Sequence, residues 1–224
     1  MNPERFRKLR RVLDHRQPDL TVLMDRVHKP HNLSAIVRNA DAVGVLEVHS
    51  VPLPGATEVP HHTSAGSAKW VEVRAHETLE AAATHLRTSG LRILAAHRSP
   101  DAHDFRSVDL TKPTAFLVGA ELEGLQPAAL AHADALISVP MVGMVQSLNV
   151  SVATSLLLYE AFRQREAAGL YEKPRLPKER YRRLLFEWAH PEVARRLRAS
   201  GRPYPSLSPD GEILRMDPAP DLRD

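Results

Sequence analysis

Short apolar segments alternate with longer amphipathic segments through most of this 224-residue chain, and this alternation constrains the fold more than any other feature. We predict strands at residues 21–24, 45–51, 70–74, 91–96, 115–118 and 136–139. We predict helices between them at residues 32–43, 79–87, 127–133 and 150–165. This βαβα order predicts an α/β domain in which helices cover a parallel sheet.

The two ends of the chain differ in composition from this central part. Residues 3–16 predict a basic helix with Phe6, Leu9, Val12 and Leu13 as its apolar stripe. Further helices are predicted at 181–188 and 191–198, and the sequence from Gly201 onward is rich in Pro, Ser and Asp. We therefore expect a basic N-terminal helix over 1–17, the α/β domain over 18–168, a basic helical extension over 169–206 and a loosely ordered tail over 207–224.

Basic charge is concentrated at both ends. Residues 1–16 carry six Lys/Arg against two acids, and residues 160–202 carry twelve against six. Because the net charge of the whole chain is +3, the remaining residues carry a net charge of −7. One basic end alone is equally well explained as a solvated helix face, but two basic ends predict arms that bind a polyanion such as RNA.

The composition excludes several classes of protein. The chain has no cysteine, which excludes disulfides, thiolate zinc sites and a cysteine nucleophile. Its longest helical apolar run, residues 150–159, is too short to span a bilayer. With 43% apolar and 25% charged residues, we expect a cytoplasmic globular protein without a membrane partner.

The segment 140–153, PMVGMVQSLNVSVA, places three small polar residues at the start of a long apolar helix. Free backbone N–H groups at a helix start, beside Ser147, Asn149 and Ser151, predict a site for a polar or anionic ligand. An ordinary helix N-cap is the alternative, since Ser and Asn are preferred caps. One cap residue, however, does not require the Gly-containing loop that precedes this helix.

Two other segments have a similar character. In residues 29–40, KPHNLSAIVRNA, Asn32 is predicted to cap the helix and Arg38 follows six residues later; a capped helix with a surface arginine is the alternative. In residues 116–125, FLVGAELEGL, a strand leads into a loop bounded by Gly119 and Gly124. Its carboxylates, Glu121 and Glu123, are either site residues or solvated turn residues.

The three segments resemble, in order, the three signature motifs of the SPOUT-class RNA ribose 2′-O-methyltransferases. The similarity runs from about Gln17 to Tyr171. Residues 18–23 and 27–34 are similar to the branch of this class that methylates guanosine 18 in the D-loop of tRNA. The resemblance implies a SPOUT fold with a C-terminal trefoil knot, a homodimer, S-adenosylmethionine as methyl donor, and no metal.

The resemblance also implies roles for individual residues. The implied catalytic residues are Arg38, Asn32, Glu121, Ser147 and Asn149. The implied cofactor contacts are Ala96, Gly119, Val139, Met144 and Leu148. From the charge distribution together with the resemblance, we expect RNA contacts from Arg5, Arg7, Lys8, Arg10, Arg11, Arg16, His31, Arg163 and Arg165. Arg38 either acts as the base, in a dry cationic environment, or orients the ribose phosphate; the sequence leaves both open.

Other functions remain as alternatives. The same chemistry on ribosomal RNA or at another tRNA position is the nearest alternative, and a non-catalytic RNA-binding module is the alternative from another class. A nicotinamide enzyme is not supported, because no Gly-x-Gly-x-x-Gly follows a strand. The twelve histidines show no metal-ligand spacing, and we expect them to be scattered over the surface.

Overall fold

A computed structural model describes residues 2–53, 69–120 and 123–214. The chain divides into two compact units, Arg16–Lys173 and a second unit formed by Met1–His15 together with Pro174–Asp224. The sequence did not predict that the two ends of the chain would belong to one unit.

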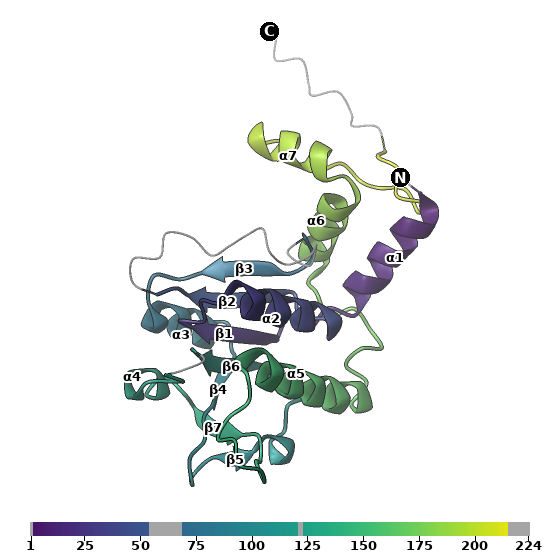
Figure 1. Ribbon diagram of the computed structural model, residues 1–224. Coiled ribbons are helices and arrows are strands. Elements are labelled where there is room, and N and C mark those ends of the chain that lie inside the picture. Colours follow the sequence, from purple (N-terminus) through teal and green to yellow (C-terminus); the bar gives the residue numbers. More distant parts are fainter. Residues whose placement is uncertain (1, 54–68, 121–122, 215–224) are drawn as a thin grey trace. The chain divides into compact units, whose positions relative to one another are not determined.

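The described residues of the larger unit form a parallel, seven-stranded sheet in the order β3-β2-β1-β6-β4-β7-β5 (Figure 1). The strands are β1 Leu20–Asp25, β2 Glu47–Val51, β3 Glu72–Ala75, β4 Arg92–Ala96, β5 His103–Asp104, β6 Thr114–Gly119 and β7 Ala135–Ser138. Neighbouring β1 and β6 run through the middle of the sheet, where every residue from Leu20 to Asp25 is buried. These near-continuous apolar runs are typical of strands covered on both faces.

Helices cover both faces of this sheet. On one face, α2 (Pro30–Ala42) and α5 (Val150–Ala167) bury residues such as Ile36 and Leu157 against the sheet. On the other face, α3 (Leu79–Thr88) and the short α4 (Pro127–Leu130) bury residues such as Leu86 and Ala129. The predicted α/β architecture is confirmed, whereas the trefoil knot stays a prediction.

Two local features differ from the sequence prediction. The two-residue strand β5 was not predicted, and it is followed by the short 3₁₀ helix η2 (Phe105–Ser107). Helix α2 begins at Pro30, with Lys29 as its N-cap residue, so the prediction that Asn32 caps it was wrong. Proline is well suited to the first position of a helix, since its missing N–H would have no partner there.

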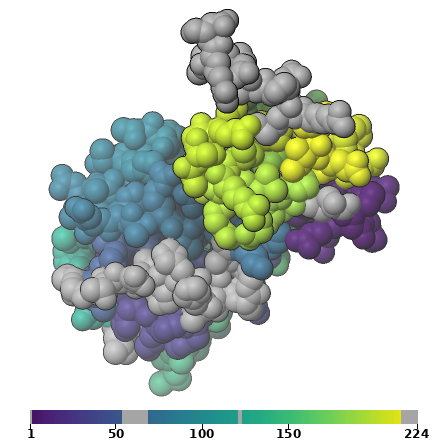
Figure 2. Space-filling model, turned by 90° about the horizontal axis from the view of Figure 1, so that it is seen from above, coloured from purple at the N-terminus to yellow at the C-terminus, as the bar shows by residue number. Residues whose placement is uncertain are grey.

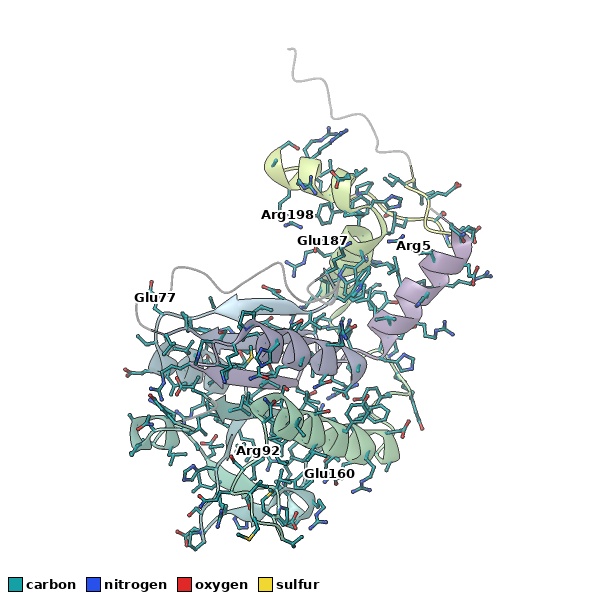
Figure 3. All side chains as sticks on the ribbon, viewed as in Figure 1. Arg5, Glu77, Arg92, Glu160, Glu187 and Arg198 are labelled. Atoms are coloured by element: carbon teal, nitrogen blue, oxygen red, sulfur yellow. The ribbon has the colours of Figure 1, made fainter. Side chains whose placement is uncertain are left out.

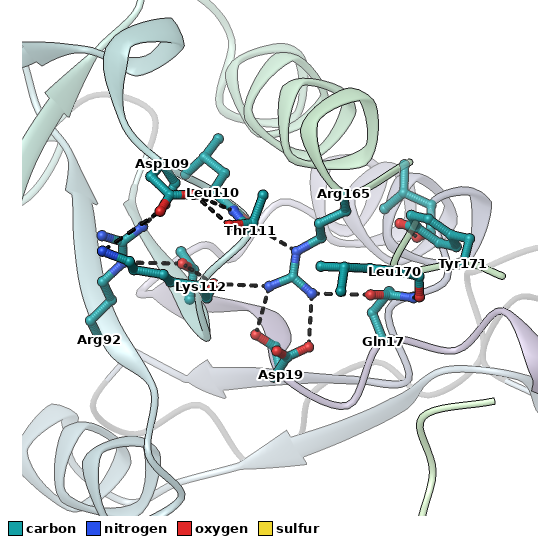
Figure 4. Close-up of polar contacts among 12 residues, drawn as sticks. Gln17, Asp19, Arg92, Asp109, Leu110, Thr111, Lys112, Arg165, Leu170 and Tyr171 are labelled. Atoms are coloured by element: carbon teal, nitrogen blue, oxygen red, sulfur yellow. Dashed lines mark hydrogen bonds and ion pairs between the residues drawn. The ribbon is translucent and has the colours of Figure 1, made fainter. Parts of the chain in front are cut away.

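Arg165 is a polar anchor inside the larger unit (Figure 4). Its side chain is fully buried on α5, and its Nη1 atom donates to Asp19 Oδ1 at 2.7 Å and to Gln17 Oε1 at 3.1 Å. Its Nε atom donates to the carbonyl of Leu110 at 3.0 Å, and Nη2 donates to the carbonyl of Lys112 at 2.9 Å. This arginine therefore joins α5 to the segments that precede β1 and β6.

The smaller unit contains α1 (Pro3–Asp14), α6 (Lys178–Ala189) and α7 (Pro191–Ala199). Three residues of the predicted stripe on α1 are buried, namely Phe6, Leu9 and Leu13. The Tyr181 hydroxyl on α6 donates to Asp14 Oδ1 on α1 at 2.8 Å. Arg198 on α7 reaches Glu187 on α6 at 2.9 Å (Figure 3).

Residues 201–214 also belong to this unit, and residues 207–214 have defined contacts, in contrast to the loose order predicted for 207–224. A β-bridge pairs Leu207 with Ile213, and His190 Nε2 lies 2.7 Å from the carbonyl oxygen of Gly211. A Cβ atom at Gly211 would lie 2.5 Å from the Phe6 ring, so this segment approaches α1 closely (Figure 2). Residues 215–224 of the predicted tail lie outside the described residues.

None of the described helices combines the length and the apolarity needed to cross a bilayer.

Candidate active site at the start of helix α5

The loop 139–149 joins β7 to α5 and displays apolar side chains. Val142 and Met144 are fully exposed, and Val145 is 61% exposed. Apolar side chains gathered at this level on one loop are unusual for a surface that faces only water. We therefore expect this loop to be covered by a ligand or by another chain.

Asn149 combines the two functions that its sequence position suggested. It is the N-cap residue of α5, where its Oδ1 atom accepts from the Ser151 backbone N–H at 2.9 Å and from the Ser151 hydroxyl at 2.6 Å. Its Nδ2 atom donates to Asn32 Oδ1 at 3.1 Å. The ordinary cap is thus present, and the same side chain also joins the third motif to the first.

Asn32 lies in the first turn of α2 and is 1% exposed. Helices α2 and α5 lie side by side on one face of the sheet (Figure 1). A second contact, from Asn39 Nδ2 to the Ser151 carbonyl at 3.4 Å, runs in parallel between the same two helices. Amide side chains from the start of α2 and from its last turns therefore join this helix to the start of α5.

Arg38 and Ser147 are exposed, in contrast to Asn32. Among the described residues, no hydrogen bond or ion pair partner is found for the Arg38 guanidinium. Glu121, the remaining predicted catalytic residue, lies outside the described residues. Glu123 is exposed and pairs with Arg26 Nη1 at 3.2 Å, which fits a solvated turn carboxylate.

Gly119 ends β6 at a point where the chain returns on itself. The Gly124 N–H donates to the Ala120 carbonyl at 2.9 Å, and Gly124 has a φ of 61°. A Cβ atom at Gly119 would lie 2.5 Å from the carbonyl carbon and oxygen of Gly124. Such a separation is far below van der Waals contact, so only glycine fits this backbone approach.

The predicted cofactor residues lie near the carboxyl ends of three neighbouring strands. Ala96 ends β4, Gly119 ends β6, and Val139 follows β7, and these strands are adjacent in the order β6-β4-β7. Ligands of open α/β sheets commonly bind at this edge. Ala96 and Val139 are half-buried and pack against the core, Leu148 is half-buried, and Met144 is exposed.

A hollow of about 550 Å³, which the sequence did not predict, lies at the carboxyl ends of β1 and β2. Its lining includes Asp25, Arg26, Val51 and Gln126. Burial raises the pKa of the Asp25 carboxyl, while the Arg26 guanidinium beside it acts in the opposite direction. Arg26 has a left-handed φ of 56°, which is uncommon for a residue other than glycine.

Two of the predicted RNA contacts require correction. Arg16 is fully buried, with Nη2 2.6 Å from Asp41 Oδ1 and Nη1 donating to the Val45 carbonyl at 2.8 Å. Arg165 is buried in the network described above. A buried, ion-paired guanidinium cannot reach a phosphate, so these two arginines have structural roles. Their partners are distant in sequence, and the charge count did not reveal them.

The other predicted RNA contacts are exposed. His31 and Arg163 are on the larger unit, where Arg163 is paired with Glu160 at 2.6 Å and 3.0 Å. On the smaller unit, the predicted contacts that are exposed on α1 are Arg5, Arg7, Lys8, Arg10 and Arg11. They share the helix with the buried stripe of Phe6, Leu9 and Leu13. Packing and a basic exposed face therefore coexist on α1.

Three histidines also depart from the prediction of scattered surface residues. His49, His76 and His85 come together with Glu47 and Arg74 between β2, β3 and α3. No sequence pattern indicated this cluster, because its members belong to different elements. His61 and His62 lie outside the described residues.

The sequence model of the SpoU rRNA methylase family matches residues 19–159, and the model of the C-terminal part of SpoU rRNA methylases matches residues 163–216. This chain belongs to the SpoU rRNA methylase family. The second match extends beyond Tyr171, where the resemblance read from the motifs ended. Residues 172–216 therefore also have a counterpart in the family.

Individual relatives cover nearly the whole chain. The tRNA (guanosine(18)-2′-O)-methyltransferase of Escherichia coli K12 is 51% identical over 95% of this chain and 94% of its own length. The crystal structure of a TrmH/SpoU tRNA-modifying enzyme from A. aeolicus superimposes with a TM-score of 0.78. It is 43% identical and covers 85% of this chain and 97% of that chain.

A third similarity concerns the cofactor. An AdoMet-bound rRNA methyltransferase from Sinorhizobium meliloti is 32% identical, with a TM-score of 0.57, over 69% of this chain and 59% of that chain. S-adenosylmethionine therefore binds to a SpoU-type methyltransferase that shares this fold.

Proposed function

We propose that this protein methylates the ribose 2′-hydroxyl of guanosine 18 in tRNA, with S-adenosylmethionine as methyl donor. The Asn32–Asn149 contact carries the proposal, because it brings the first and third motifs together at the starts of α2 and α5. The near-complete match to tRNA (guanosine(18)-2′-O)-methyltransferase supports the choice of substrate.

The residues at the carboxyl edge of the sheet fit this cofactor. Val139 and Leu148 offer half-buried apolar surface, and Met144 offers an exposed apolar side chain beside them. The close approach of Gly119 to Gly124 holds the second-motif loop in place.

The main chemical problem is the proton on the nucleophile. Bound S-adenosylmethionine supplies a methyl group on a positively charged sulfur, and the ribose 2′-oxygen must lose its proton to accept it. Arg38 is the residue that we assign to this hydroxyl or to its neighbouring phosphate. A guanidinium has a pKa above about 12 in water, so a role as base requires a dry, cationic surrounding.

The two roles of Arg38 give different results in a lysine variant. Lysine retains a positive charge that orients a phosphate but lacks the planar fork of arginine. If Arg38 orients the phosphate, Arg38→Lys retains a measurable rate whose dependence on pH is unchanged. If Arg38 is the base, the rate of Arg38→Lys rises with pH as the amine loses its proton.

A homodimer is part of the proposal. On α5, Val152, Leu156 and Tyr159 are 48%, 40% and 50% exposed, and they follow one another at helical spacing. Together with exposed Val142 and Met144, they form an apolar surface that a second copy would cover. Sedimentation analysis of the wild type and of Leu156→Glu tests the proposed homodimer. We expect the wild type to be a dimer and Leu156→Glu to be a monomer.

Mapping of the methylated nucleotide tests the proposed substrate. Purified tRNA and rRNA are incubated with enzyme and labelled cofactor, and mass spectrometry locates the new methyl group. We expect it at guanosine 18 of tRNA; methylation of rRNA alone identifies the rRNA alternative. If calorimetry detects no binding of S-adenosylmethionine, the protein is a non-catalytic RNA-binding module. We place the enzyme in the cytoplasm, where tRNA and the cofactor are present.

Arg38→Ala tests the site itself. We expect the rate of methyl transfer to fall by more than tenfold, equivalent to about 1.4 kcal/mol or more in the barrier, with cofactor affinity unchanged. Arg87→Ala is the matched control, since it also removes one exposed arginine from a helix of the larger unit, on the other face of the sheet. Equal activity of the two variants would remove Arg38 from the mechanism.

A further inference from the structure

Three histidines, a glutamate and an arginine form a compact cluster between β2, β3 and α3. Glu47 and His49 come from β2, Arg74 from β3, His76 from the residue after β3, and His85 from α3. The three imidazole centroids are 5.2 to 5.6 Å apart. Asn32 and Arg38 belong to α2, and Asn149 caps α5, on the other face of the sheet, so the reaction proposed above does not use this cluster.

Arg74 shows which nitrogen of His85 is unprotonated. Its Nη1 atom lies 2.9 Å from His85 Nε2, and its Nε atom lies 3.0 Å from Glu47 Oε1. A guanidinium only donates hydrogen bonds, so His85 Nε2 must accept with its lone pair. Two acceptors, one nitrogen and one carboxylate oxygen, therefore converge on a cation.

His49 offers a third donor atom next to these two. It is buried, and its Nε2 atom lies 3.6 Å from Glu47 Oε1. Its Nδ1 atom lies 2.9 Å from His76 Nε2. One ring nitrogen of His49 therefore faces His76 and the other faces Glu47.

We propose that Glu47, His49 and His85 form a binding site for a divalent transition metal, with Zn²⁺ as the ion that best suits two imidazoles and one carboxylate. One ligand atom from each residue lies within 4.8 Å of the others. A tetrahedral zinc site with bonds of about 2.0–2.1 Å places its ligands about 3.4 Å apart, so small side-chain rotations suffice.

His76 completes the arrangement as an outer partner. When His49 Nε2 binds a metal, its Nδ1–H donates to His76 Nε2. Metal-binding histidines almost always donate their other N–H in this way, which fixes the ring orientation. His76 thus lies where an outer hydrogen-bond acceptor is required.

Arg74 competes with the metal for the same acceptors. Its side chain is 39% exposed and its Nη2 atom is 3.9 Å from Glu72 Oε1, on a residue that is itself 57% exposed. The guanidinium can therefore leave toward Glu72 when a metal enters. Removal of Arg74 strengthens binding, whereas removal of a ligand weakens it. These opposite signs distinguish this site from non-specific binding by surface histidines.

The experiment uses full-length protein that has been freed of metal by chelation. Zn²⁺ affinity is measured by calorimetry, and Co²⁺ is titrated to observe the visible absorption of a low-symmetry nitrogen and oxygen site. We expect one ion per chain. His85→Ala and Glu47→Gln should weaken binding at least about tenfold, and Arg74→Ala should strengthen it. His103→Ala is the control, because His103 is exposed on β5, at the opposite edge of the sheet.

Two results would overturn the site. One is the absence of stoichiometric binding in both the wild type and Arg74→Ala; Arg74→Ala leaves the three ligands intact. The other is an equal loss of Zn²⁺ affinity in His85→Ala and His103→Ala, because it would show that the metal binds only to surface histidines. Circular dichroism confirms that each variant is folded. Methyl transfer by the wild type is measured separately, so failure of the metal site does not bear on the proposed function.

Discussion

At the scale of single residues, buried arginines such as Arg165 hold together segments in the interior of the larger unit. Arg165 is joined to Gln17, Asp19 and two backbone carbonyls, and these partners would lose their donor in Arg165→Gln. We expect this change to lower the free energy of unfolding by about 3–5 kcal/mol, as for other broken buried ion pairs. Urea denaturation of the purified protein measures it.

Arg163→Gln is the matched control for Arg165→Gln. It removes the same charge two residues away, but from an exposed pair with Glu160 that contributes no more than about 1 kcal/mol. If both variants lose the same stability, Arg165 is not an anchor.

Another single residue, His49, makes the free energy of unfolding depend on pH. Its pKa is about 3 in the folded protein, against an ordinary value of 6.5. Between these values the unfolded chain binds the additional proton, so the free energy of unfolding falls as the pH falls from about 6.5 toward 3. The slope reaches at most about 1.4 kcal/mol per pH unit, and above pH 6.5 the contribution is constant.

Urea denaturation at pH 7 and pH 5 measures this dependence. We expect His49→Gln to lose less stability between the two pH values than the wild type does. His103→Gln should behave as the wild type. Equal pH dependence in His49→Gln and in the wild type would show that His49 titrates normally.

At the scale of elements, the second-motif loop depends on Gly119. A Cβ atom there would meet the backbone of Gly124 at 2.5 Å, and backbone cannot rotate away as a side chain can. We expect Gly119→Ala to lower stability by about 1–3 kcal/mol, the range for overpacking, and to weaken S-adenosylmethionine binding. Calorimetry and thermal unfolding measure the two effects.

Gly124→Asn provides the comparison within the same loop. Gly124 has a positive φ, but a Cβ atom there would meet none of the described residues within 4 Å, and asparagine tolerates this conformation better than other residues do. We expect its effect on both measurements to be smaller. A larger effect in Gly124→Asn would mean that the turn conformation, and not the close approach at Gly119, controls the loop.

The sequence predicted elements better than it predicted contacts. Apolar runs such as Leu20–Asp25 predicted the central strands, because both faces of these strands are buried. β5 has only two residues, too few to show a period. The charge pattern predicted RNA contacts at Arg16 and Arg165 because their acidic partners, Asp41 and Asp19, lie 25 and 146 residues away in sequence. The histidine cluster was missed for the same reason, since only the fold brings β2, β3 and α3 together.

At the scale of the whole molecule, we expect the basic residues at the two ends of the chain to bind RNA phosphates. α1 buries Phe6, Leu9 and Leu13, so deletion of residues 1–16 would remove core packing together with charge. A fourfold variant tests the charge more specifically than this deletion does. It replaces Arg5, Arg7, Lys8 and Arg11 by Gln and leaves the apolar stripe intact. Arg10 is retained because it interacts with Tyr181.

We expect this fourfold variant to bind tRNA more weakly while its affinity for S-adenosylmethionine is unchanged. Binding releases fewer counterions for each phosphate contact that the variant lacks. The slope of log affinity against log salt concentration should therefore flatten by about 0.7–0.9 per lost contact. The measurement is tRNA affinity of both proteins at several salt concentrations, with circular dichroism as the folding control. Coincident slopes would mean that α1 serves packing alone, and that the phosphate contacts come from other exposed basic residues.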